Sequence, residues 1–142
     1  NILMALKFIG DEGIGTDRNI GNGKFEITEG EITINTPQDA THILNIGLFC
    51  PESKQQLTEM LSDNSRFEIL QRGGWITSPD YITYRKKSIK MFKEGCVFKK
   101  PQQNNNLLYG KIVDLKPLQT PVPIQHPIWR VGKSIFLPIK SN

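Results

Sequence analysis

Short segments that alternate apolar and polar side chains dominate this chain of 142 residues, and they predict a fold rich in β-strands. From residue 41 onward such segments recur between glycine- and proline-containing turns, as in RFEIL and GKIVDL. Only residues 2–9 and 51–63 have apolar residues at helical spacing. A strand-rich chain with two helices indicates the α+β class with an antiparallel sheet.

Three stretches carry more specific predictions. Residues 24–28 and 31–35 alternate well enough for two strands, with Glu29 and Gly30 as the hairpin turn between them. The prolines of residues 117–127 each remove a hydrogen-bond donor and predict an extended connector. The last segment, residues 129–140, is expected to be a single strand.

Length and composition suit one domain, 1–142, with a hydrophobic core. No apolar run reaches the roughly 20 residues that a membrane span needs, and no signal peptide opens the chain. Cys50 and Cys96 lack metal-site spacing and are expected to be buried, reduced thiols, which fits a cytoplasmic location. The chain opens on a helical pattern with neither an initiator methionine nor a residue before it to cap the helix. We therefore expect the C-terminal part of a longer protein.

Basic residues are concentrated in one segment. Residues 66–100 hold nine Lys or Arg and three acidic residues, whereas the whole chain has a net charge of +4. Such a concentration suits a polyanion, most commonly a nucleic acid. The alternative is a solvated basic surface without a ligand.

Four glycines flank a polar centre in GIGTDRNIGNG, residues 13–23. They follow a predicted helix and precede a predicted strand, the reverse of the order in a dinucleotide-binding fingerprint, and no P-loop motif is present. An anion bound here would need backbone amides turned into a concavity, with help from Arg18 and Lys24. The alternative is a set of tight turns in which glycine only supplies positive φ angles.

Five segments in order carry a family resemblance: GDEGIGTDRNIGNGKFEI, RGGWI, RKKSIKMFKEGCVF, GKIVDL and HPIWRVGKSIFLPI. The first resembles the glycine-rich loop of RAMP proteins, the RNA-binding subunits of CRISPR effector complexes. The ordered series resembles the C-terminal half of Csm subunit four of type III-A complexes, a Cas5-group RAMP protein. The matching subunit of the type III-B complex stays open.

The resemblance implies a ferredoxin-like (RRM-like) RAMP fold, an antiparallel sheet with helices on one face. The strand–helix–strand order of residues 41–70 agrees with it. It also implies a non-catalytic subunit that anchors the 5′ handle of the guide RNA (crRNA) and contacts the large polymerase/cyclase subunit and a backbone RAMP subunit. We expect no cofactor, metal or membrane partner. The residues expected to bind RNA are Gly13, Gly15, Arg18, Asn19, Gly21, Gly23, Lys24, Arg72, Arg85 and Lys87.

Two other functions remain open. Related RAMP nucleases cut repeat RNA with a histidine as general acid–base, so His42 and His126 are candidates, although no residue spacing marks a partner for either. An architectural adaptor could instead use the basic surface to bind acidic proteins. Trp75 could stack on an unpaired base. A core or interface position is the alternative for Trp75, as it is for Trp129.

Overall fold

The computed structural model describes residues 1–76, 84–101 and 107–140, and the chain divides into two compact units. Unit 1 is Asn1–Asn35 and unit 2 is Thr36–Asn142. Each unit is built around its own backbone contacts, so the two are described separately. That the whole chain forms one domain stays a prediction.

Unit 1 consists of helix α1 (Ile2–Glu12), a short 3-10 helix η1 (Thr16–Ile20) and an extended tail. The side chain of Asn1 accepts a hydrogen bond from the Leu3 amide at 3.1 Å, so the expectation of an uncapped helix start is wrong. The Gly13 amide closes the other end by donating to the Ile9 carbonyl at 2.8 Å.

The predicted hairpin of residues 24–28 and 31–35 does not form. Over the described backbone of unit 1 these residues are extended without a ladder partner, and Ile32 is 89% exposed. The Phe25 amide bonds instead to the Gly10 carbonyl beside it. Alternation alone misled here, because an isolated two-stranded hairpin without a surface to cover is marginally stable.

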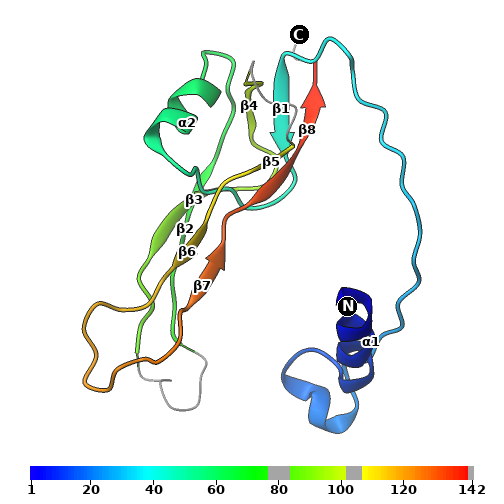
Figure 1. Cartoon of the computed structure of the whole chain (residues 1–142), viewed down its shortest axis with the longest axis vertical. Helices are drawn as coiled ribbons and strands as arrows, with labels where there is room; N and C mark the ends of the chain where they lie inside the picture. The colour runs from blue at the N-terminus through cyan, green and yellow to red at the C-terminus, as the bar shows by residue number, and fades with distance from the viewer. Residues whose placement is uncertain (77–83, 102–106, 141–142) are drawn as a thin grey trace. The chain divides into compact units, whose positions relative to one another are not determined.

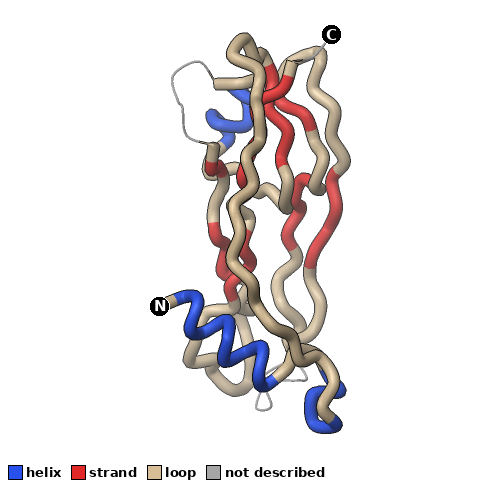
Figure 2. Tube along the Cα trace, turned by 90° about the vertical axis from the view of Figure 1, so that its right-hand side faces the viewer, coloured by secondary structure: helices blue, strands red, loops and turns tan. Residues whose placement is uncertain are grey.

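Unit 2 contains a four-stranded antiparallel sheet in the order β4-β1-β8-β5 and two antiparallel ribbons, β2-β3 and β6-β7 (Figure 1). The strands of the sheet are β1 (His42–Asn45), β4 (Val97–Lys99), β5 (Leu108–Tyr109) and β8 (Ser134–Ile139). Those of the ribbons are β2 (Ile69–Arg72), β3 (Ile89–Phe92), β6 (Ile112–Asp114) and β7 (Trp129–Val131). Both ribbons extend away from the sheet in the same direction (Figures 1 and 2).

Helix α2 (Lys54–Met60) follows β1 and confirms the predicted helix. Ser53 caps it by accepting from the Gln56 amide at 3.1 Å, and the fully buried Met60 joins the core. The α+β class and the antiparallel pairing are therefore confirmed. The ferredoxin-like arrangement stays a prediction, because β2, the strand after α2, pairs with β3 rather than entering the sheet of β1.

Aromatic rings fill the core between the sheet and α2. Phe49 is fully buried and packs with ring centroids 5.0 Å from Phe136, 5.7 Å from Phe98 and 5.8 Å from Phe92. Tyr109 adds an edge-on contact to Phe136. Edge-to-face pairs at these separations stabilise the core beyond the area that they bury.

The predicted single strand of residues 129–140 is interrupted where three backbone segments meet. The Cys50 amide donates to the Gly132 carbonyl at 2.9 Å, Gly132 donates to the Lys111 carbonyl at 3.0 Å, and Lys111 donates to the Cys50 carbonyl at 3.0 Å. A Cβ atom at position 132 would lie 2.5 Å from the Cβ of Cys50. Glycine is therefore required at this junction, and the segment is split into β7 and β8.

Both cysteines are free and buried, as predicted, and burial raises the pKa of the Cys50 thiol. Within the described residues, no helix combines the length and apolar character that crossing a bilayer requires.

Candidate nucleic-acid interface

The glycine-rich loop of unit 1 is closed at its base by backbone hydrogen bonds. The Ile14 amide donates to the Gly23 carbonyl at 3.0 Å, and the Asn22 amide donates to the Asp17 carbonyl at 3.4 Å. These amides point into the loop rather than toward a ligand. The predicted amide concavity therefore loses several of its donors to internal contacts.

All four glycines of the loop have positive φ angles: Gly13 at 84°, Gly15 at 104°, Gly21 at 87° and Gly23 at 78°. A Cβ atom at Gly13 or Gly23 would also collide with the opposite side of the loop, at Asn22 and Ile14 respectively. At Gly15 and Gly21 the space is open. Backbone conformation thus gives every one of the four a structural reason, and their contact with RNA stays a prediction.

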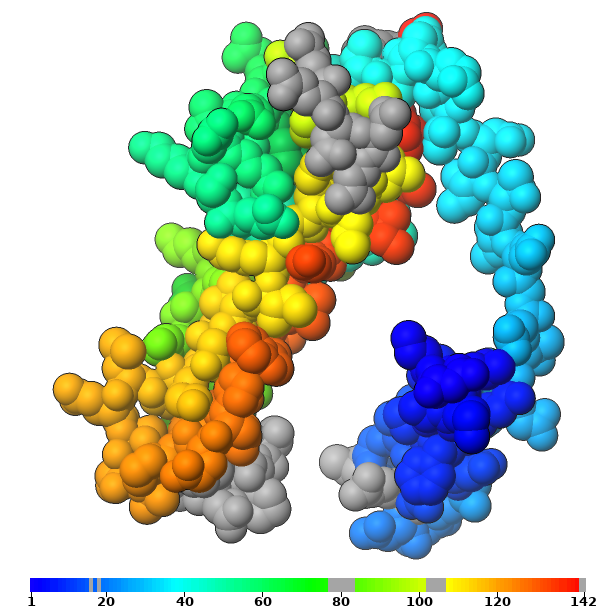
Figure 3. All heavy atoms as spheres, in the orientation of Figure 1, coloured from blue at the N-terminus to red at the C-terminus, as the bar shows by residue number. Residues whose placement is uncertain are grey.

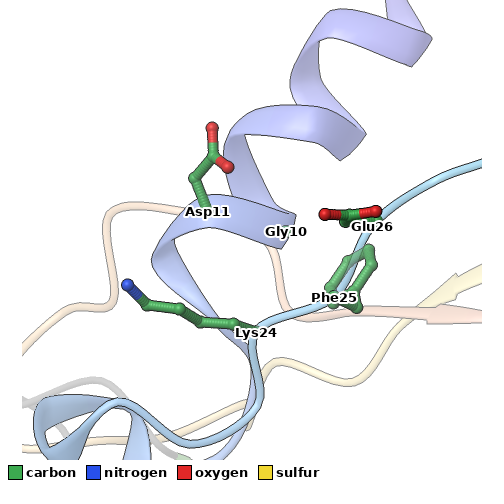
Figure 4. Close-up of a pocket in the computed structure, with 5 residues that line it drawn as sticks. All are labelled: Gly10, Asp11, Lys24, Phe25 and Glu26. Atoms are coloured by element: carbon green, nitrogen blue, oxygen red, sulfur yellow. The ribbon is translucent and has the colours of Figure 1, made fainter.

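The polar residues of the loop lie in mixed electrostatic surroundings. Lys24 lines an open pocket of about 420 Å³ together with Gly10, Asp11, Phe25 and Glu26 (Figure 4). Two carboxylates and one ammonium group give this pocket no attraction for phosphate. Asn19 is exposed in η1, and Arg18 belongs to the same helix, although its side chain lies outside the described part of the structure.

The three basic candidates of unit 2 lie on one ribbon. Arg72 ends β2, and Arg85 and Lys87 precede β3; all three are exposed. Between the pairs Arg72–Ile89 and Trp75–Arg85, two residues of one strand face three of the other. This is a β-bulge, and Gly74, with φ of 109°, lies within it. The structure therefore brings Arg72, Arg85 and Lys87 together on the β2-β3 ribbon.

The bulge also joins the two ribbons. The Lys87 amide turns away from its own ladder and donates to the Leu115 carbonyl, just beyond β6, at 2.9 Å. The adjacent Asp114 closes the loop that connects β6 to β7, because its Oδ1 accepts from the Lys116 amide at 2.9 Å and the Ile128 amide at 2.8 Å. The loop projects beyond the ribbon (Figure 3), and within it Ile124 is buried.

These two hydrogen bonds lower the pKa of Asp114, with smaller contributions from the charges of Lys116 and Lys87. The carboxylate therefore stabilises the loop above the ordinary aspartate pKa, and this contribution is lost as pH falls through the lowered value. We expect the Ile128 amide resonance to stay constant from neutral pH down to about pH 4 and to shift below it. NMR titration checks this.

Asp114→Ala should accelerate amide exchange at Lys116 and Ile128 at neutral pH, whereas Asp114→Asn, which keeps an acceptor oxygen, should accelerate it much less. The amides of β2 serve as the internal control. Unchanged exchange in Asp114→Ala would contradict a role for this carboxylate in closing the loop.

The two histidines lie at opposite ends of unit 2. His42 is buried in β1, with its Nδ1 2.8 Å from the Thr41 hydroxyl oxygen, and His126 is exposed in the loop after β6 (Figure 1). They are not brought together as a catalytic pair. Among the described residues, no three His, Cys, Asp or Glu side chains gather in a group that could hold a metal ion.

Comparison with known proteins gives a family. Residues 38–139 match the family model described as the CRISPR Csm4 C-terminal domain, so the match covers nearly all of unit 2. The chain belongs to the Csm4 C-terminal domain family. Over 97% of its length it is also 25% identical to a protein of Methanocaldococcus jannaschii named CRISPR system Cms protein Csm4. The chain spans 39% of that relative's length.

The family match confirms the resemblance inferred from the five ordered segments. It begins after the glycine-rich loop, so among the expected RNA-binding residues only Arg72, Arg85 and Lys87 fall within the matched Csm4 domain. The remaining seven belong to unit 1.

Sequence reasoning missed two features of this Csm4 domain. The guanidinium carbon of Arg85 lies 4.9 Å from the ring centroid of Trp75, and the indole is 53% exposed. The other feature is the loop closure by Asp114. Its signal was an aspartate at the end of a predicted strand, directly before a proline-rich loop, where an acceptor for loop amides is common.

Proposed function

We propose that this chain is a non-catalytic, RNA-binding part of a cytoplasmic type III-A CRISPR effector complex. In this proposal it anchors the 5′ handle of the crRNA and contacts the large polymerase/cyclase subunit and a backbone RAMP subunit. The observation that carries the proposal is membership of the Csm4 C-terminal domain family over residues 38–139.

The charge distribution supports a polyanionic ligand. Residues 69–92, which make up the β2-β3 ribbon and its connection, contain five basic residues and one acidic residue. Their side chains are mostly exposed, and Arg72 and Lys87 have no described carboxylate bonded to them. Phosphate groups are the ligands that such a surface attracts most strongly in an RNA-processing complex.

The histidines support a binding role. A general acid–base must reach the bond that it cleaves, and the buried His42 is engaged by Thr41 within the sheet. His126 lies at the other end of the unit without that partner (Figure 1). Neither arrangement resembles a positioned catalytic pair.

The test compares binding of an RNA with a repeat-derived 5′ handle by the full chain and two sets of variants. The ribbon set is Arg72→Ala, Arg85→Ala and Lys87→Ala, and the loop set is Arg18→Ala and Lys24→Ala. Glycine variants are unsuitable, because any side chain at the four positive-φ positions strains the loop before RNA is added. Lys93→Ala is the matched control, since Glu68 already neutralises Lys93 at 3.1 Å.

Each variant that removes a phosphate contact should lose about 1.5–3 kcal/mol of binding free energy. It should also reduce the salt dependence by about 0.7 per contact. Lys93→Ala should bind like the unmodified chain. Site-specific cleavage of the RNA that His42→Ala or His126→Ala abolishes would instead establish a nuclease. Stable complex assembly without protection of the handle nucleotides would establish an adaptor.

A further inference from the structure

Trp75 is presented to solvent by the backbone rather than by chance side-chain packing. It is bridged to Arg85 across the ribbon, and the flanking hydrogen bonds run from Ile76 to Tyr84 and from Lys86 to Gly74, both at 2.9 Å. The indole is nevertheless 53% exposed. A large, flat apolar ring is thereby held at a fixed position on the surface.

Arg85 lies over this ring, with its guanidinium carbon 4.9 Å from the ring centroid. Arginine stacked on an aromatic face keeps its edge donors free for a carboxylate or a phosphate. No described residue forms a hydrogen bond or an ion pair with the Arg85 guanidinium. The pair therefore combines an apolar face with an available cation.

The chain contains a natural contrast in Trp129. That indole is 62% exposed on the other ribbon, where the residue opposite it is Asp114. A carboxylate beside Trp129 disfavours an approaching phosphate, whereas Arg85 beside Trp75 favours it. The two tryptophans thus differ in the charge of their cross-strand partner while sharing exposure and strand context.

We propose that Trp75 and Arg85 form a stacking platform for an unpaired nucleobase of single-stranded RNA. The base stacks on the indole, and Arg85 pairs with an adjacent phosphate. Only a ligand that carries both a planar base and a neighbouring anion satisfies both groups. This inference rests on the proposed RNA-binding function and adds base stacking at a particular pair of residues.

The experiment measures tryptophan fluorescence of the full chain during titration with octauridylate. Trp129→Phe leaves Trp75 as the only tryptophan, and Trp75→Phe leaves Trp129. Octauridylate should quench Trp75 and leave Trp129 unchanged. Affinity should fall about 5- to 150-fold in Trp75→Ala. It should fall less in Trp75→Phe, which keeps an aromatic ring, and should not change in Trp129→Ala.

The same titration with an abasic octaribonucleotide separates stacking from charge. Weaker binding of the abasic strand, with no quenching of Trp75, supports the platform. If the unmodified chain binds octauridylate while Trp75→Ala and Trp75→Phe bind it equally well, the platform is overturned and RNA binding stands. Failure of the unmodified chain to bind would overturn the RNA function itself. Equal quenching of Trp75 by oligoglutamate would overturn the platform in favour of an acidic protein ligand.

Discussion

Replacing Phe49 by alanine is expected to lower the free energy of unfolding by about 3–5 kcal/mol, the range for removing a large aromatic ring from a packed core. Phe49 is fully buried and contacts three other phenylalanine rings. These rings come from β3, β4 and β8, so they cannot close over the cavity without moving several strands. Guanidinium denaturation of the full chain, followed by circular dichroism, measures the change.

Phe67→Ala is the matched control. Phe67 is 50% exposed and makes an edge-on contact with Phe92 at 5.5 Å, so its loss should cost about 1 kcal/mol. A similar cost for the two variants would show that Phe49 is not the centre of the core.

Gly132→Ala is expected to destabilise unit 2 by about 1–3 kcal/mol through overpacking at the backbone junction. The added methyl group would lie 2.5 Å from the Cβ of Cys50 and 2.9 Å from the carbonyl oxygen of Lys111. Since the φ angle of Gly132 is not in the left-handed region, the cost is steric alone. Thermal melting of the full chain measures it.

Gly73→Ala provides the comparison, because a Cβ there would make only an ordinary contact, 3.5 Å from the Cβ of Ser88. Its φ angle also allows any residue. We expect no loss of stability, or a gain of about 0.4–1 kcal/mol from a stiffer unfolded chain. Equal destabilisation by both substitutions would contradict a special role for position 132.

Local signals in the sequence were sufficient for α1, for α2 and for the buried strand β1. In each, apolar spacing and nearby turn residues agree with what the element packs against. The hairpin of residues 24–35 failed because alternation does not reveal whether a partner surface exists. The break at Gly132 was hidden for a similar reason, since it depends on the distant backbone of Cys50.

The candidate site shows the same division. The basic segment of residues 66–100 was visible in the sequence, and Arg72, Arg85 and Lys87 do lie on one ribbon. The pairing of Trp75 with Arg85 was not visible, because it depends on a bulge that shifts the register by one residue. Spacing along one strand does not reveal which residues lie opposite each other once such a shift occurs.

The junction of Cys50, Lys111 and Gly132 has a consequence for how this protein can diverge in sequence. Its three hydrogen bonds use backbone atoms, so they place no demand on side chains other than the small size of Gly110 and Gly132. Exposed residues of the β6-β7 ribbon can therefore be exchanged without altering how the ribbon joins the sheet. Surface chemistry and ribbon geometry are separately variable, which lets mutation retune a ligand preference while the scaffold stays in place.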